Sequence, residues 1–226
     1  RNQTPKSLFC WQLARGFPPL SSADTLILIQ AEVGKMSSIP FRTPIPVEAL
    51  QSEDRLLEIR DRSTYTKILM RERKGETLSE ELGVKYGESK LRTDRTLVCG
   101  SRPGEWTLYN SSAEVNSLLQ TLETYGERVA ITDLTHGRAL MSVEGDCARS
   151  LLEKVCNIDF SEEMVPDGAS FSASVGSVSC DLVRADSDQV LFFLSCERSF
   201  GLYLFKVLAD AGKEFGCVVP PELDLH

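Results

Sequence analysis

The feature that most constrains the fold is an order of elements, strand–helix–strand–strand–helix, which the hydrophobic pattern predicts twice along the chain. Apolar residues alternate with polar ones in the predicted strands and recur at i, i+3, i+4 and i+7 in the predicted helices. The strands are predicted within residues 57–71, 96–99, 106–109, 139–143, 171–175, 178–183 and 190–194. The helices are predicted at residues 78–82, 112–125, 147–155 and 198–215.

Local signals mark where the predicted helices begin and end. Capping boxes, Thr77 with Glu80 and Ser111 with Glu114, precede two of the helices, and Asp146 can cap a third. Glycines follow the predicted ends at Gly83, Gly126 and Gly216. The inward face of the last helix is predicted to carry Tyr203, Leu204, Val207, Leu208 and Ala211.

Such units bury one face of a sheet under two helices, so the fold class predicted is α+β, with two pseudo-repeated two-layer sandwiches. We place the first half at residues 42–126 and the second at residues 127–226. Residues 1–41 fit neither half and are interpreted as an N-terminal extension, with Met36 as a candidate initiator.

Composition excludes several classes of protein. The 226 residues carry a net charge of −8, which disfavours nucleic-acid binding because contact with phosphate needs a basic face. No apolar run approaches the roughly 18 residues that span a bilayer, so no membrane association is expected. Seven cysteines without a CxxC pair indicate reduced thiols in a cytoplasmic protein. With two histidines and no cysteine cluster, no metal site is predicted.

Sequence motifs for cofactors and catalysis are also missing. The chain has no GxGxxG after a strand, no GxxxxGK[ST], no GxSxG and no HExxH. We therefore predict no catalytic residue and no cofactor bound by this chain, and any flavin or nicotinamide is expected on another polypeptide.

Three sites have both a chemical and a structural interpretation. His136 could act as a base oriented by Asp133, but a turn capped by Asp133 and Thr135 is favoured. Cys156 and Cys180 could be nucleophiles, but burial as small apolar residues is favoured. The charged stretches are interpreted as solvated or ion-paired surface: Glu80–Glu81, Glu162–Glu163 and residues 55–74. Asn110 begins a formal glycosylation sequon, although Ser111 is better explained as a helix cap.

Several ordered segments resemble the gamma subunit of heterotetrameric sarcosine oxidase. The segments GEWTL, DLTHGR, EGDCAR and CNIDF resemble that family's GPDEWLL, DxSxxR, xGxxAR and CPxDL patterns. The segment RSFGLYL, followed by DA and EF, resembles RSFxxYL…DA…E[YF], and an earlier pair of segments resembles LREL…NLR. Together the matches extend over about residues 42–216.

The resemblance implies the folate-binding body of the glycine-cleavage T-protein, without that protein's C-terminal barrel. It also implies a complex with alpha, beta and delta subunits that converts sarcosine, tetrahydrofolate and oxygen to glycine, 5,10-methylenetetrahydrofolate and hydrogen peroxide. In that family FAD, FMN, NAD and tetrahydrofolate are expected on partner subunits, and the gamma chain is not credited with the chemistry.

Folate-active relatives carry an Asn, a Gly pair and an Asp pair around the turn that aligns with residues 173–181. Here Ala173 occupies the Asn position, and Cys180 replaces the first carboxylate. Gly176 and Asp181 remain as vestiges of a folate site, so the resemblance implies that this chain does not catalyse folate chemistry.

Two alternatives stay open: a freestanding folate-binding aminomethyltransferase-type protein, and an accessory subunit of another amine dehydrogenase. A subunit of an obligate complex should expose an apolar patch when isolated. We expect that patch near Tyr203, Phe205 and Phe192.

Overall fold

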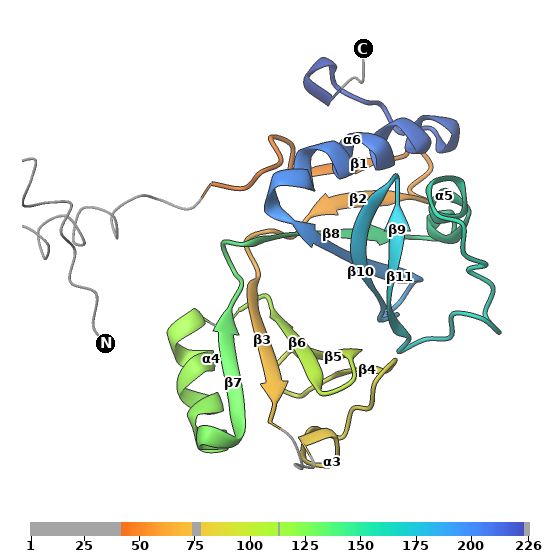
Figure 1. Cartoon of the computed structure of the whole chain (residues 1–226). Coiled ribbons are helices and arrows are strands. Elements are labelled where there is room, and N and C mark those ends of the chain that lie inside the picture. The colour runs from red at the N-terminus through yellow and green to blue at the C-terminus, as the bar shows by residue number, and fades with distance from the viewer. Residues whose placement is uncertain (1–41, 74–77, 113, 224–226) are drawn as a thin grey trace, which may run out of the picture. The chain divides into compact units, whose positions relative to one another are not determined.

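Two antiparallel sheets, of six and five strands, form the frame of the molecule (Figure 1). The structure is a computed structural model that describes residues 42–73, 78–112 and 114–223. Apart from Arg42, the described residues belong to one unit that begins at Thr43. The predicted extension 1–41, the candidate initiator Met36 and the capping residue Thr77 lie outside the described residues.

Strand order differs from chain order in both sheets. The six-stranded sheet runs β1 (Ala49–Gln51), β2 (Glu58–Asp61), β8 (Arg138–Glu144), β11 (Leu191–Glu197), β10 (Val178–Arg184), β9 (Ser170–Val175). The five-stranded sheet runs β4 (Ser89–Leu91), β5 (Thr96–Arg102), β6 (Glu105–Asn110), β3 (Thr66–Glu72), β7 (Val129–Asp133). The helices are α3 (Leu78–Leu82), α4 (Val115–Leu122), α5 (Ala148–Val155) and α6 (Gly201–Gly212). Short 3₁₀ turns follow α4 at Glu123–Arg128, flank α6 at Arg198–Phe200 and Lys213–Phe215, and close the described chain at Pro221–Leu223.

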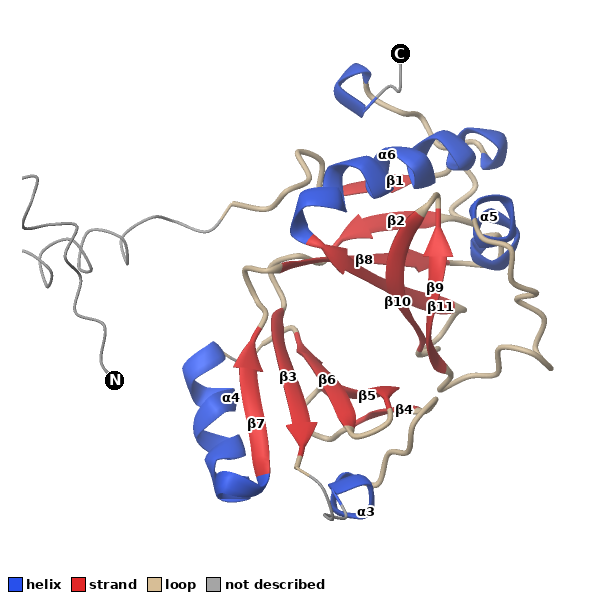
Figure 2. Cartoon of the chain, viewed as in Figure 1, coloured by secondary structure: helices blue, strands red, loops and turns tan. Residues whose placement is uncertain are grey.

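Each sheet has a hydrophobic core under its own helices. Helices α5 and α6 lie beside the six-stranded sheet, and α3 and α4 lie beside the five-stranded sheet (Figure 2). Apolar residues of each sheet pack against these helices. A third, smaller cluster lies between the sheets and joins residues of β5, β6, β8 and β10. The two-residue repeat of a strand explains this layering. Along β10, Cys180 and Leu182 belong to the helix-side core, whereas Val183 belongs to the cluster between the sheets.

The two halves of the chain exchange strands. Strands β1 and β2, from residues 42–126, pair in the six-stranded sheet next to β8. Strand β7, from residues 127–226, pairs with β3 in the five-stranded sheet. The chain therefore crosses between the sheets at residues 62–65 and returns at residues 134–137, so sheet membership does not follow a boundary at 126/127.

The α+β class is confirmed, and all seven predicted strand segments lie in or overlap observed strands. The long final helix is also present, as α6 with its flanking 3₁₀ turns. The internal repeat stays a prediction. Strands β1, β4 and β7 were not predicted.

Two predicted caps are wrong. Helix α4 begins after Glu114, without a side-chain cap, and the Ser111 hydroxyl lies 3.5 Å from that of Ser112 instead. Helix α5 begins after Cys147, and Asp146 does not cap it. Helix α4 also ends at Leu122, before the 3₁₀ turn that contains Gly126.

The predicted orientation of three aromatic residues is wrong as well. Tyr203, expected on the inward face of the last helix and also near an exposed patch, is 47% exposed, so the inward orientation is the expectation that is wrong. Phe192 and Phe205, expected near an exposed patch, are fully buried, because β11 is an interior strand and Phe205 lies on the sheet-facing side of α6. Among the described residues, no helix combines the length and the apolar character that a bilayer crossing requires.

Candidate functional site

His136 lies in the turn that joins β7 to β8, and the turn has the structural role favoured by the sequence. The Thr135 amide donates to the Asp133 carboxylate at 2.8 Å, and the Thr135 hydroxyl accepts from the Lys67 amide at 3.0 Å. The interpretation of Asp133 and Thr135 as turn residues is thus confirmed. His136 itself is exposed at the tip.

Cys156 and Cys180 are both buried, as the sequence favoured. Cys156 ends α5, and burial raises the pKa of its thiol. Cys180 faces the helix-side core, where its thiol donates to the Val178 carbonyl at 3.4 Å. The neighbouring Cys196 thiol and burial raise the pKa of Cys180. Neither position favours a thiolate at Cys156 or Cys180, so neither thiol is suited to nucleophilic attack on a substrate.

The acidic pairs are exposed and take part in ion pairs. Glu81 pairs with Arg128 at 2.7 Å, and Glu162 pairs with Arg149 and Arg184. Asn110 is buried, and its side-chain amide donates to the Thr96 hydroxyl at 2.8 Å, so the sequon that it begins is not presented on the surface.

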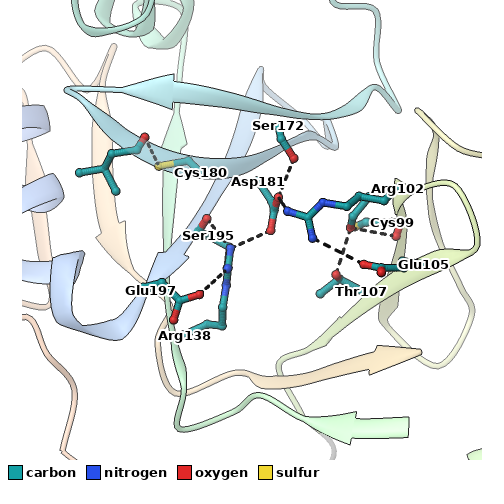
Figure 3. Close-up of polar contacts among 12 residues, drawn as sticks. Cys99, Arg102, Glu105, Thr107, Arg138, Ser172, Cys180, Asp181, Ser195 and Glu197 are labelled. Carbon is teal, nitrogen blue, oxygen red and sulfur yellow. Dashed lines mark hydrogen bonds and ion pairs between the residues drawn. The ribbon is translucent and has the colours of Figure 1, made fainter. Parts of the chain in front are cut away.

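A polar cluster centred on Asp181 lies between the sheets (Figure 3). Asp181 Oδ2 lies 2.7 Å from Arg138 Nη2, and Oδ1 accepts a 2.8 Å hydrogen bond from the Ser172 hydroxyl. Arg102 of the opposite sheet approaches Oδ1 at 3.9 Å. Arg138 also donates to the Ser195 hydroxyl at 3.1 Å and to the Ser195 backbone carbonyl at 2.9 Å. Figure 3 shows the Cys180 sulfur on the other side of the same strand from the Asp181 carboxylate.

The cluster lines a cavity of about 270 Å³ whose other walls come from β3, β5, β6 and the β7–β8 turn. Glu105 and Arg102 reach it from the five-stranded sheet and form an ion pair at 3.5 Å. Sequence analysis identified only Asp181 of this group. Arg138 ends the DLTHGR segment, which was the one sequence signal that pointed toward it.

Gly176, the other vestigial candidate, does not lie with Asp181. It and Ser177 form the two-residue turn between β9 and β10, where both have positive φ (53° and 69°). A Cβ at Gly176 would lie 2.8 Å from the Val207 side chain of α6. The glycine therefore allows close packing of the hairpin on α6, five residues along the strand from Asp181.

Lys67 ties together the two connections that cross between the sheets. Its side chain is fully buried, and its ammonium donates to the carbonyls of Ser63 (2.7 Å), Tyr65 (2.9 Å) and Thr135 (3.2 Å). The first two acceptors lie in the outgoing connection and the third in the returning one, which run side by side in Figure 1. All three ammonium protons are thus used in holding backbone.

The pKa of Lys67 is lowered to about 8, chiefly by burial. The positive charges of Arg198 and Arg138 contribute to the lowering, whereas the negative charges of Asp61 and Asp133 oppose it. Between about pH 8 and pH 10 the unfolded chain therefore binds more protons at this residue than the folded chain, and stability gains with rising pH. We expect the stability of the wild type relative to a Lys67→Met variant to increase by about 2 kcal/mol from pH 7 to pH 10. Urea titrations of both proteins at each pH measure this difference, and parallel pH profiles would contradict it.

The arrangement around Asp181 is that of a neutralised ionic network. Each carboxylate oxygen accepts a hydrogen bond from the chain itself, one from Arg138 and one from Ser172, so the negative charge of Asp181 is already paired within the chain. Among the residues that the structure describes, no group of three or more His, Cys, Asp or Glu side chains could hold a metal ion.

Comparisons with known proteins are consistent with this fold. No protein-family model matches the chain, and no curated protein does. A chain of the heterotetrameric sarcosine oxidase from Corynebacterium sp. U-96, in complex with pyrrole 2-carboxylate, is similar with a TM-score of 0.64 and 23% identity. That match covers 76% of this chain and 91% of the other.

The glycine cleavage system aminomethyltransferase T from Bartonella henselae is similar with a TM-score of 0.51 and 15% identity. It matches over 66% of this chain, which spans only 44% of the aminomethyltransferase. At such identities the likeness concerns the fold, and the fold of this chain is T-protein-like.

Proposed function

We propose that the chain is the non-catalytic gamma-type subunit of a cytoplasmic heterotetrameric sarcosine oxidase. The observation that carries the proposal is the match to one chain of such an oxidase over 91% of that chain's length. The matched chain is therefore a whole subunit of similar length, and not one domain of a larger chain. The complex would convert sarcosine, tetrahydrofolate and oxygen to glycine, 5,10-methylenetetrahydrofolate and hydrogen peroxide. Its alpha, beta and delta subunits would hold FAD, FMN, NAD and tetrahydrofolate.

The state of Asp181 supports a structural role for this chain. A carboxylate that served folate chemistry would be directed at the ligand, whereas both oxygens of Asp181 are directed at side chains of this chain, Arg138 and Ser172, with Arg102 at 3.9 Å. The ion pair instead joins β8 to β10 and, through Arg102, the six-stranded sheet to the five-stranded sheet.

An exposed apolar surface at the start of α6 supports assembly with a partner. Phe200, Leu202 and Tyr203 are consecutive or nearly so, and they are 51%, 37% and 47% exposed. Large apolar side chains grouped in this way are typical of an interface with another subunit. Tyr203 was one of the three residues expected there, and Phe200 and Leu202 take the places of Phe192 and Phe205.

Affinity purification of the full-length tagged chain, co-expressed with the genes adjacent to its own, tests the proposal. We expect flavin absorbance and N-methylglycine oxidation to co-elute with the tag. A Phe200→Ser/Tyr203→Ser variant should lose most of the co-eluting flavin, whereas Tyr86→Ser, which alters a tyrosine that is 62% exposed elsewhere, should retain it.

Two results would contradict the proposal. One is a monomeric chain that elutes without flavoprotein from cells expressing those genes. The other is heat released on titration of the isolated chain with tetrahydrofolate, which would favour the freestanding folate-binding protein, since the other likeness is to an aminomethyltransferase.

A further inference from the structure

Cys180 and Cys196 lie directly opposite each other on neighbouring strands. Strands β10 and β11 pair antiparallel, with Asp181 opposite Ser195 and Leu182 opposite Leu194. Continuing this register by one residue places Cys180 opposite Cys196. Because both side chains belong to the helix-side core, the two thiols extend from the same face of the sheet.

The hydrogen-bond pattern shows which kind of pair this is. Ala185 donates its amide to Leu191, the residue opposite it in the same register, so hydrogen-bonded pairs fall at odd-numbered positions of β10. Cys180 therefore occupies a non-hydrogen-bonded position relative to β11. Such pairs have Cα atoms about 4.5 Å apart and the closer side chains. That separation is within the range of about 4.4 to 6.8 Å found in disulfides.

The two thiols influence each other's titration. The Cys180 thiol donates to the Val178 carbonyl at 3.4 Å. Its neighbour Cys196 raises the pKa of Cys180, whereas the pKa of Cys196 is lowered by Cys180 and by the positive charge of Arg138. Both residues are buried, 1% and 0% exposed, so only a small oxidant or a local opening of the sheet gives access to them.

From this juxtaposition we propose that Cys180 and Cys196 are a modification site, a dithiol that hydrogen peroxide converts to a cross-strand disulfide. The proposal stands on the strand register and is independent of the proposed function. If that function also holds, the peroxide would be the product of the same complex.

The chemistry balances in two steps. The Cys196 thiolate attacks one oxygen of hydrogen peroxide and becomes a sulfenic acid, while the O–O bond breaks and the other oxygen leaves, with a proton, as water. The Cys180 sulfur then attacks the sulfenic sulfur, an S–S bond forms, and the hydroxyl leaves with the thiol proton as a second water. Two electrons pass from the thiols to the peroxide, and external dithiol restores the reduced pair.

Peptide mapping of the full chain tests the proposal directly. Trypsin cleaves after Arg184, so residues 155–184, which carry Cys156 and Cys180, separate from residues 185–198, which carry Cys196. Native protein is treated with hydrogen peroxide, its free thiols are alkylated, and it is digested. We expect one linked peptide pair, with the mass of two hydrogens lost, and its disappearance after treatment with dithiothreitol.

A Cys156→Ala variant removes the other cysteine of the first peptide and should form the same linked pair at the wild-type rate. Cys180→Ala should abolish it. Alkylation of both Cys180 and Cys196 after peroxide treatment would overturn the proposal, as would a link that forms only in urea. In the second case the unfolded chain, and not the strand pair, would bring the sulfurs together. In the wild type, an alkyl group on Cys156 within the linked pair assigns the bridge to Cys180, so a variant that fails to fold does not affect the test.

Discussion

Replacing Gly100 by Ala is expected to lower the free energy of unfolding by about 3 kcal/mol or more, because backbone already occupies the space a side chain needs. A Cβ at Gly100 would lie 2.1 Å from the carbonyl oxygen of Lys85 and 2.8 Å from its carbonyl carbon. Two backbone hydrogen bonds fix this approach. Gly100 donates to Glu88 at 2.8 Å, and Gly87 donates to Gly100 at 3.0 Å.

Because the neighbouring atoms are backbone, they cannot turn away as a flexible side chain could. Urea unfolding followed by circular dichroism measures the loss. Gly137→Ala is the matched control: neither glycine has positive φ, and the nearest atom to a Cβ at Gly137 lies at 3.7 Å. The control should change stability by no more than about 1 kcal/mol. Equal losses in the two variants would show that the close approach at Gly100 does not matter.

Replacing Arg138 by Met should cost about 2 to 3 kcal/mol, because it leaves the Asp181 carboxylate with only Ser172 and a distant Arg102. The Arg138 and Asp181 side chains are 18% and 15% exposed, so water offsets part of the loss. Combining Arg138→Met with Asp181→Asn should restore about half of it, since no uncompensated charge then remains.

Arg128→Met provides the control for the ionic effect. It breaks the ion pair with Glu81, in which the two side chains are 44% and 39% exposed. Surface pairs of this kind contribute little, so the change should lie within about 0.5 kcal/mol. A double variant no more stable than Arg138→Met alone would show that Arg138 acts through its packing and its bonds to Ser195, and not through Asp181.

The main strands could be predicted from the sequence because alternate residues along each strand face different surroundings, either the helices or the opposite sheet. In β8, Ala139, Met141 and Val143 pack toward the helices, whereas Leu140 packs between the sheets. Strands β1 and β4 have three residues each, too few to show a pattern, and in the five-residue strand β7 only Val129 is buried. Their pairing is decided by the neighbouring strand, which is information that a local window does not contain.

The caps failed for a related reason. Asn110 accepts the amide of Ser112 at 2.8 Å and so forms a turn that delays the start of α4 to Val115. Local side-chain bonds of this sort compete with a capping box, and the sequence motif alone does not decide between them.

The candidate site was largely beyond sequence reasoning. Arg138 and Asp181 are 43 residues apart, and only the pairing of β8, β11 and β10 brings them together. Lys67 lies in a charged run that was interpreted as exposed, yet it is fully buried. Lys67 is buried where the two connections between the sheets, residues 62–65 and 134–137, lie side by side. This arrangement depends on the topology and cannot be predicted from composition.

The exchange of strands between the sheets has a consequence for dissecting this molecule into pieces. A fragment that started at residue 127 would leave the flank of β8 open where β2 belongs, and a fragment that stopped at 126 would leave β3 without β7. Neither piece would be a self-sufficient folding unit. Cleavage of the backbone between residues 126 and 127 should therefore yield two polypeptides that stay associated and unfold together, because each supplies strands that complete the other's sheet.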